Sequence, residues 1–236
     1  MGHIGVAVIG AGQAGLSAAH WLGKRGIDHV LFDPSVPGDT WLSRWDSFHL
    51  VTPNWTVDLP GFPYTGDDPD GFMHRNEIAD HVAAFAEQFR SLIRPARVER
   101  LKIGNSWTVD TTDGRWTADA VVVATGSHPV PKRPPVGEEI PSNVFQIHSS
   151  RYRSPDELPA GAVLVAGSGQ SGAQIVDDLL LGGRRVWFAV GSAAAAPRRY
   201  RGRDMAAWFH DLGFMSRPMT PESRRAVSVM VSGRDG

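Results

Sequence analysis

The sequence predicts an α/β fold with two lobes, because one local pattern occurs twice along its 236 residues. Residues 6–26, VAVIGAGQAGLSAAHWLGKRG, contain a short apolar run, a glycine-rich turn and a helical pattern in this order. Residues 163–183, VLVAGSGQSGAQIVDDLLLGG, repeat that order late in the chain. A strand, a glycine turn and a helix begin a dinucleotide-binding βαβ unit. We therefore predict two Rossmann-like dinucleotide-binding lobes of the three-layer ββα type, the second inserted in the first.

The first glycine turn has the spacing G-x-G-x-x-G. In such a turn the first glycine permits the sharp bend, the second lets a pyrophosphate approach the backbone, and the third lets helix and strand pack closely. The N–H groups and the positive dipole end of the following helix favour a phosphate at this place. Residues 29–33, HVLFD, form the next strand, and the carboxylate of Asp33 would accept hydrogen bonds from a ribose. The binding residues predicted in this unit are Gly10, Gly12, Gln13, Ala14, Gly15 and Asp33.

A long irregular stretch follows the first unit. Residues 34–75 are rich in Pro, Gly, Trp and Asp, and their many tryptophans favour an ordered, functional loop over a disordered one. After it, Asn76 is the predicted N-cap of an amphipathic helix. Asp113-Gly114 is the predicted turn of a β-hairpin that leads into a central strand at 121–124.

Proline marks the expected boundary between the lobes. HPVPKRPP at 128–135 is a stiff, polyproline-like connector, so we expect one domain at 1–135 and a second at 136–236. Residues 192–236 contain a short amphipathic helix but no further strand–glycine–aspartate–helix pattern that would return the chain to the first lobe. We therefore expect a C-terminally truncated chain.

The second glycine turn has the same spacing but a different ending. Val190 stands where the first unit has Asp33, and Arg198 and Arg199 follow. A missing acid removes repulsion and nearby arginines can pair with a 2′-phosphate, so NADP(H) is favoured over NAD(H). The alternative interpretation is that these arginines are solvated surface residues without a role in binding. The binding residues predicted in this unit are Gly167, Ser168, Gly169, Gln170, Ser171, Gly172, Ser192 and Arg198.

Two nucleotide sites in one chain favour one tightly held cofactor and one that is exchanged. The simplest assignment is FAD in the first loop and NADPH in the second, with hydride passing from the nicotinamide to the flavin. Flavin enzymes that reduce disulfides need a cysteine pair, and this chain has no cysteine. Oxygen activation and electron delivery to another acceptor both stay open. The nine histidines show no ligand spacing with acids, so we predict no metal site.

Several motifs together resemble those of the flavin-containing monooxygenases. They are GAGQAG paired with GSGQSG, ATG at 124–126, GDTW at 38–41 and HSSRY at 148–152. In that family a segment F-x-G-x-x-x-H-x-x-x-[Y/F] precedes the second glycine loop. His148 and Tyr152 match its last two anchors, whereas Ser142 and Val144 stand at its Phe and Gly positions. The resemblance implies further cofactor-binding residues at Trp41, Thr125, Gly126, His148 and Tyr152.

The resemblance also implies a mechanism. Reduced flavin would react with O₂ to give a C4a-hydroperoxide, kept from water by bound NADP⁺, which oxygenates a small organic nucleophile. This chemistry requires a dry pocket and a hydrogen-bond donor near flavin N5 more than an acid–base catalyst. Some relatives place an asparagine directly after the threonine of an L-x-T motif; here Pro53 stands at that position and Asn54 follows. Asn54 and His49 are the candidate catalytic residues, and a structural role in the loop is the alternative for each.

Charge and hydrophobicity limit the classes of partner that the chain is expected to bind. A net charge of −1 creates no overall field that favours nucleic acid or an anionic membrane. No apolar run approaches the roughly 20 residues that span a bilayer. We expect a cytoplasmic protein that takes a small-molecule substrate and O₂, without nucleic acid or membrane; a homodimer is compatible with the sequence. An NADPH-dependent electron-transfer flavoprotein without oxygenation and a non-catalytic nucleotide-binding fragment are the alternatives.

Overall fold

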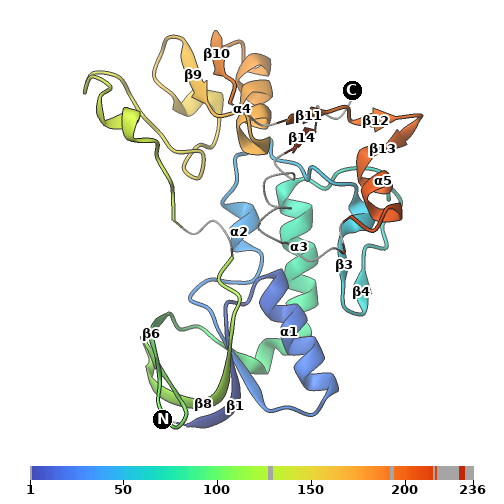
Figure 1. Cartoon of the computed structure of the whole chain (residues 1–236), viewed down its shortest axis with the longest axis vertical. Helices are drawn as coiled ribbons and strands as arrows, with labels where there is room; N and C mark the ends of the chain where they lie inside the picture. The colour runs from blue at the N-terminus through green and yellow to red at the C-terminus, as the bar shows by residue number, and fades with distance from the viewer. Residues whose placement is uncertain (1, 127–129, 192–193, 215, 217–228, 232–236) are drawn as a thin grey trace. The chain divides into compact units, whose positions relative to one another are not determined.

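The computed structural model describes residues 2–126, 130–191, 194–214, 216 and 229–231, and it divides into two compact units (Figure 1). The first unit consists of Met1–Ser43, Trp55–Pro69 and Met73–Lys132. The second unit consists of Arg44–Asn54, Asp70–Phe72 and Arg133–Gly236. Two pieces of the long tryptophan-rich stretch therefore belong to the second unit, although the first unit surrounds them in the sequence.

A six-stranded sheet in the order β5-β2-β1-β8-β7-β6 forms the first unit. Strands β5, β2, β1 and β8 run parallel, and β7 and β6 continue the sheet as an antiparallel meander. The strands are β1 (His3–Ile9), β2 (His29–Phe32), β5 (Ile93–Arg94), β6 (Val98–Ile103), β7 (Trp107–Thr111) and β8 (Gly114–Val123). The remaining elements of this unit are α1 (Gln13–Lys24), α2 (Asp39–Leu42), α3 (Arg75–Ala86), the hairpin β3 (Asp58–Leu59) and β4 (Phe62–Pro63), and the 3-10 segment Glu87–Leu92. The 3-10 segment Asn54–Thr56 begins at the last residue of a second-unit piece, Asn54, and continues in the first unit.

The parallel strands are covered on both faces. Val8 pairs with Leu31, and a Cβ at Gly15 of α1 would lie 3.5 Å from Cγ1 of Val8, so α1 packs on this face. On the opposite face, Phe32 joins a core cluster with Val109 of β7. Helix α1 therefore packs on one face, and side chains of the antiparallel strands join the core on the other, which is the expected ββα layering.

Helix α3 begins differently from the prediction. Its N-cap is His74, whose ring accepts the N–H of Asn76, while the Glu77 side chain accepts the N–H of His74. The predicted N-cap at Asn76 is wrong, because this reciprocal capping box begins the helix two residues earlier. The predicted hairpin is confirmed, but its turn lies one residue earlier: Thr111 pairs with Gly114, so Thr112 and Asp113 form the loop and Gly114, at φ 134°, begins β8.

The second unit contains the second βαβ repeat. Strands β9 (Val163–Ala166) and β10 (Val186–Ala189) are parallel and are joined by α4 (Gln170–Leu181). The other elements are β11 (Ala194–Ala196), β12 (Arg199–Tyr200), β13 (Arg203–Asp204), α5 (Met205–Asp211), β14 (Val229–Val231) and the 3-10 segments Pro135–Glu138 and Pro155–Glu157. Two parallel strand–glycine turn–helix–strand units in one chain confirm the predicted α/β fold. Within the described residues, none of the helices has the length and apolar character needed to cross a membrane.

Candidate dinucleotide-binding sites

Two glycines of the first loop are required by the protein itself. Gly10 has φ 106°, and a Cβ at this position would collide with the carbonyl oxygen of Ala124. A Cβ at Gly15 would collide with the carbonyl oxygen of Gly10. These two contacts bring the end of β1, the start of α1 and the end of β8 into close packing, as expected for the first and third glycines of the motif.

Gly12 has no such internal reason to be glycine. Its φ of −79° suits any residue, and a Cβ would meet no atom within 4 Å. It is also the N-cap of α1, where no side chain caps the helix. An open space in front of uncapped helix N–H groups fits a pyrophosphate that approaches the backbone.

Asp33 lies directly beside this loop. Its Oδ2 accepts the backbone N–H of Ala11 at 2.7 Å, and its Oδ1 accepts the N–H of Ser35 at 2.9 Å. Thr125 follows β8 next to Gly10, since its backbone nitrogen would lie 3.4 Å from a Cβ at Gly10. The structure thus brings the first glycine loop, Asp33 and the segment that carries Gly126 together; Thr125 and Gly126 are exposed.

The GDTW motif forms a short helix against α3. Gly38 has φ 101°, and a Cβ there would lie 2.7 Å from the carbonyl oxygen of Ala79, so this close approach requires glycine. Trp41 lies on α2 and is half-buried, and its backbone N–H donates to Gly38. A contact between Trp41 and a cofactor stays a prediction.

The second loop repeats the geometry of the first. Gly167 has φ 109°, and a Cβ at Gly172 would collide with the carbonyl oxygen of Gly167. Gly169 has φ −73°, no atom within 4 Å of an added Cβ, and no side-chain cap on α4. Gln170 and Ser171 form the first turn of α4 behind it. This loop therefore offers the same open, uncapped helix end as the first.

Ser168 does not face that open space. Its side chain is only 3% exposed, and its Oγ accepts the backbone N–H of Gly191 at 3.0 Å. Val190, at the end of β10, is exposed and carries no charge. Ser192, also predicted to bind the nucleotide, lies outside the described residues.

His148 and Tyr152 make contacts within the second unit. Nδ1 of His148 accepts the backbone N–H of Ser150 at 3.1 Å. Tyr152 is 2% exposed and donates its hydroxyl to Asp178 of α4 at 2.6 Å. Burial, and next the hydrogen bond to Asp178, raise the pKa of Tyr152 above its ordinary value. The Tyr152 contact fixes the segment before β9 on the helix that follows the glycine loop.

The candidate catalytic residues both belong to the second unit. The carbonyl oxygen of His49 accepts the side-chain amide of Gln174 on α4 at 3.0 Å. Asn54 is 4% exposed, and its backbone N–H donates to Gly71 at 2.9 Å. Gln174 was not singled out from the sequence, because its partner is 125 residues away and no local pattern signals the pair. Catalytic roles for His49 and Asn54 stay predictions.

Arg198 is buried and contacts three separate segments of the second unit. It is 3% exposed, its Nε lies 2.7 Å from the carboxylate of Asp204, and its Nη1 donates to the carbonyl oxygen of Val51 at 2.6 Å. Its guanidinium also lies 4.0 Å from the ring centre of Phe72. Burial lowers the pKa of Arg198, and Asp204 opposes this shift. Arg198 thus connects the pieces Arg44–Asn54 and Asp70–Phe72 within the second unit, through Val51 and Phe72. Its contact with a 2′-phosphate stays a prediction.

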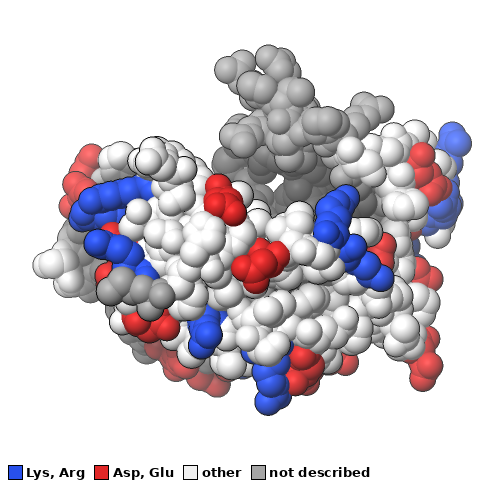
Figure 2. All heavy atoms as spheres, turned by 90° about the horizontal axis from the view of Figure 1, so that it is seen from below, with Lys and Arg blue, Asp and Glu red and all other residues white. Residues whose placement is uncertain are grey.

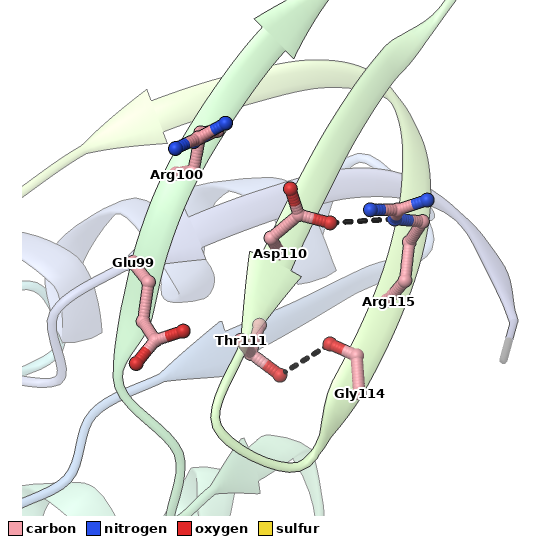
Figure 3. A pocket seen from close by; sticks show the side chains of 6 residues that line it. All are labelled: Glu99, Arg100, Asp110, Thr111, Gly114 and Arg115. Atoms are coloured by element: carbon pink, nitrogen blue, oxygen red, sulfur yellow. Dashed lines mark hydrogen bonds and ion pairs between the residues drawn. The ribbon is translucent and has the colours of Figure 1, made fainter.

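A separate surface depression of about 500 Å³ lies on the antiparallel strands (Figure 3). It is lined by Glu99, Arg100, Asp110, Thr111, Gly114 and Arg115. The Arg115 side chain lies 2.5 Å from the Asp110 carboxylate, so neighbouring charges already neutralise each other. The depression is at the start of β8, whereas the first glycine loop is at the other end of that strand. It is therefore a different feature from the dinucleotide sites.

The charged groups are mixed on the face that Figure 2 shows. Lys and Arg side chains stand between Asp and Glu side chains among the described residues there, without a field of one sign. This agrees with the net charge of −1.

Comparison with known proteins identifies the family. The profile of the pyridine nucleotide-disulphide oxidoreductases matches residues 7–203, which include both glycine loops. The chain belongs to this family. The chain carries no cysteine, so it lacks the thiol pair that members need for disulfide exchange.

The relatives confirm the resemblance to flavin-containing monooxygenases. An uncharacterized oxidoreductase CzcO-like of Geobacillus kaustophilus is 38% identical over 217 residues, covering 90% of this chain and 62% of that protein. Human flavin-containing monooxygenase 3 is 30% identical over 202 residues, covering 74% of this chain and 37% of that protein. The solved flavin-containing monooxygenase of Stenotrophomonas maltophilia is 28% identical, with a TM-score of 0.78 over 98% of this chain and 71% of that chain. The chain thus spans about half to two thirds of the curated bacterial relatives it matches.

A pyridine nucleotide in the family description and a flavin in the names of these relatives are the two cofactor classes predicted for the two loops. The expected cofactor classes, a flavin and a pyridine nucleotide, are therefore confirmed at the level of the family. The loop that holds each cofactor stays a prediction.

Proposed function

We propose that this chain is the dinucleotide-binding part of an FAD- and NADPH-dependent monooxygenase, with FAD in the first glycine loop and NADPH in the second. Gly12 and Gly169 carry the proposal. Both have ordinary backbone angles and open space around an added Cβ, so neither backbone strain nor internal packing requires glycine there, whereas a closely approaching pyrophosphate does.

The residues of the first loop suit a resident dinucleotide. The uncapped start of α1 would bind the pyrophosphate, and Asp33 would accept the ribose hydroxyls with the lone pairs that Ala11 and Ser35 leave open. The residues of the second loop suit NADPH, since Val190 stands where a carboxylate would repel a 2′-phosphate.

The bound flavin would take hydride from NADPH and activate O₂, so that one oxygen atom enters a small organic nucleophile and the other leaves as water. The route through flavin C4a that the resemblance implies is part of this proposal. The chain's own contribution is to bind and orient the two cofactors and to exclude water. His49 and Asn54 are the residues that we propose near the reacting flavin.

The test uses the purified 236-residue chain with added FAD. We expect a protein-bound flavin spectrum, NADPH-dependent bleaching of that spectrum without oxygen, and oxygen uptake when air is admitted. Transfer of oxygen to a thioether or a tertiary amine, measured by mass spectrometry with ¹⁸O₂, identifies the monooxygenase. Peroxide as the only oxygen product would support electron transfer without oxygenation instead. A chain that binds neither FAD nor NADPH would contradict the proposal.

A further inference from the structure

In each unit one side chain ties the second position of the glycine loop to the end of the following strand. In the first unit the acceptor comes from the strand end: Asp33 accepts the N–H of Ala11 at 2.7 Å. In the second unit the acceptor comes from the loop: Ser168 accepts the N–H of Gly191 at 3.0 Å. The two bonds join the same two places, but the side chain and the backbone have exchanged ends.

We propose that Ser168 is a positioning residue that holds the second loop without a carboxylate and so makes this site suitable for NADP(H). This inference rests on the proposed function, because it concerns how the proposed NADPH site is built. Ser168 would act through the loop backbone and through Gly191, not by touching the 2′-phosphate.

The surroundings of Ser168 support this role. At 3% exposure its hydroxyl is held inside the unit, away from the open space in front of Gly169. A Cβ at Gly191 would lie 3.9 Å from Oγ of Ser168, so the strand end approaches the loop closely. The bond is between two neutral groups, and the strand end at Val190 stays uncharged and 65% exposed. An acid placed there could hold the loop as Asp33 does, but its charge would repel a 2′-phosphate.

The arrangement of the first unit can be rebuilt in the second as a test. Ser168→Ala removes the bond, Val190→Asp adds the acid alone, and the double variant reproduces the Ala11–Asp33 pair of the first unit. Ser168→Thr keeps the hydroxyl as the conservative control. Dissociation constants for NADP⁺ and NAD⁺ are measured by titration calorimetry, and the exchange of the Gly191 amide proton is followed by hydrogen–deuterium exchange.

Ser168→Ala should lower the affinities for NADP⁺ and NAD⁺ by a similar factor, about tenfold for one lost hydrogen bond. It should also speed the exchange of the Gly191 amide proton. Ser168→Thr should keep both affinities near their wild-type values. Val190→Asp should lower the affinity for NADP⁺ alone, and the double variant should regain NAD⁺ binding while NADP⁺ binding stays weak. Because loss of a buried hydroxyl can also destabilise the unit, Ser168→Cys, with a weaker acceptor of similar size, repeats the comparison.

The outcomes separate this inference from the proposed function. A wild-type chain that binds neither nucleotide overturns the proposed function, and this inference with it. Wild-type binding together with unchanged affinities in Ser168→Ala and Ser168→Cys overturns the positioning role alone. Loss of NADP⁺ binding alone in Ser168→Ala would also overturn it, since that pattern indicates a direct contact with the 2′-phosphate.

Discussion

The backbone N–H of Ala11 donates to the carboxylate of Asp33 at 2.7 Å, so the end of β2 holds the second position of the first glycine loop. Asp33 was predicted from the sequence as a ribose acceptor, and the structure adds this contact to the loop itself. A carboxylate has about four lone-pair sites, so the bonds to Ala11 and Ser35 leave room for a ribose. One residue can therefore both shape the loop and bind the ligand.

Replacing Asp33 should affect stability and FAD binding together. Asp33→Ala leaves two backbone N–H groups without their acceptor, which should lower the free energy of unfolding by about 1–3 kcal/mol. Asp33→Asn keeps one acceptor oxygen, so its free energy of unfolding should fall by less. Urea unfolding measures the first effect and FAD titration the second. Full stability in Asp33→Ala would show that the two bonds contribute little to the folded unit.

Gly12→Ala and Gly15→Ala should separate binding from folding. A methyl group at Gly12 enters open space, so the variant should lose only about 1 kcal/mol of stability, because alanine is a weaker N-cap than glycine, while FAD affinity falls at least about tenfold. A methyl group at Gly15 meets the carbonyl oxygen of Gly10, so this variant should lose stability, by more than about 2 kcal/mol. Thermal unfolding and flavin fluorescence measure both variants under the same conditions. Unchanged FAD binding by a folded Gly12→Ala would contradict the assignment of the site.

Local patterns explain what could be predicted. The glycines at 15 and 172 follow a fixed spacing because a Cβ at either position would collide with the carbonyl oxygen five residues earlier in the same turn, and Gly10 and Gly167 both adopt a positive φ. The bonds between Tyr152 and Asp178 and between Arg198 and Val51 span 26 and 147 residues. Such pairs depend on how the whole unit folds, and a single sequence carries no signal for them. The N-cap of α3 was misplaced because Asn76 is the stronger cap by residue type, whereas His74 completes a capping box.

Tyr152→Phe should change the alkaline stability of the chain. The variant loses the hydroxyl bond to Asp178, which should lower the free energy of unfolding by about 1–3 kcal/mol at neutral pH. The pKa of Tyr152 in the folded chain is raised above the ordinary 10.0, so its contribution is present below about pH 10 and is lost as the pH rises further. Between about pH 9 and 11 the wild-type chain should therefore lose more stability than the variant. Urea unfolding across this range tests the difference, and parallel curves would contradict it.

Replacing Arg198 should mainly destabilise the second unit. Arg198→Met keeps apolar bulk over Phe72 but leaves the largely buried carboxylate of Asp204 without its cation, which should lower the free energy of unfolding by about 3–5 kcal/mol. Arg199→Met, at an exposed neighbour, is the matched control and should change stability by less than about 0.5 kcal/mol. Asp204→Asn added to Arg198→Met should recover part of the loss, because the asparagine can still cap α5 at Ala206 without a buried charge. The affinities for NADP⁺ and NAD⁺, measured on the folded variants, test the predicted phosphate contact separately. A contact lowers the affinity for NADP⁺ alone, whereas a packing role changes both or neither.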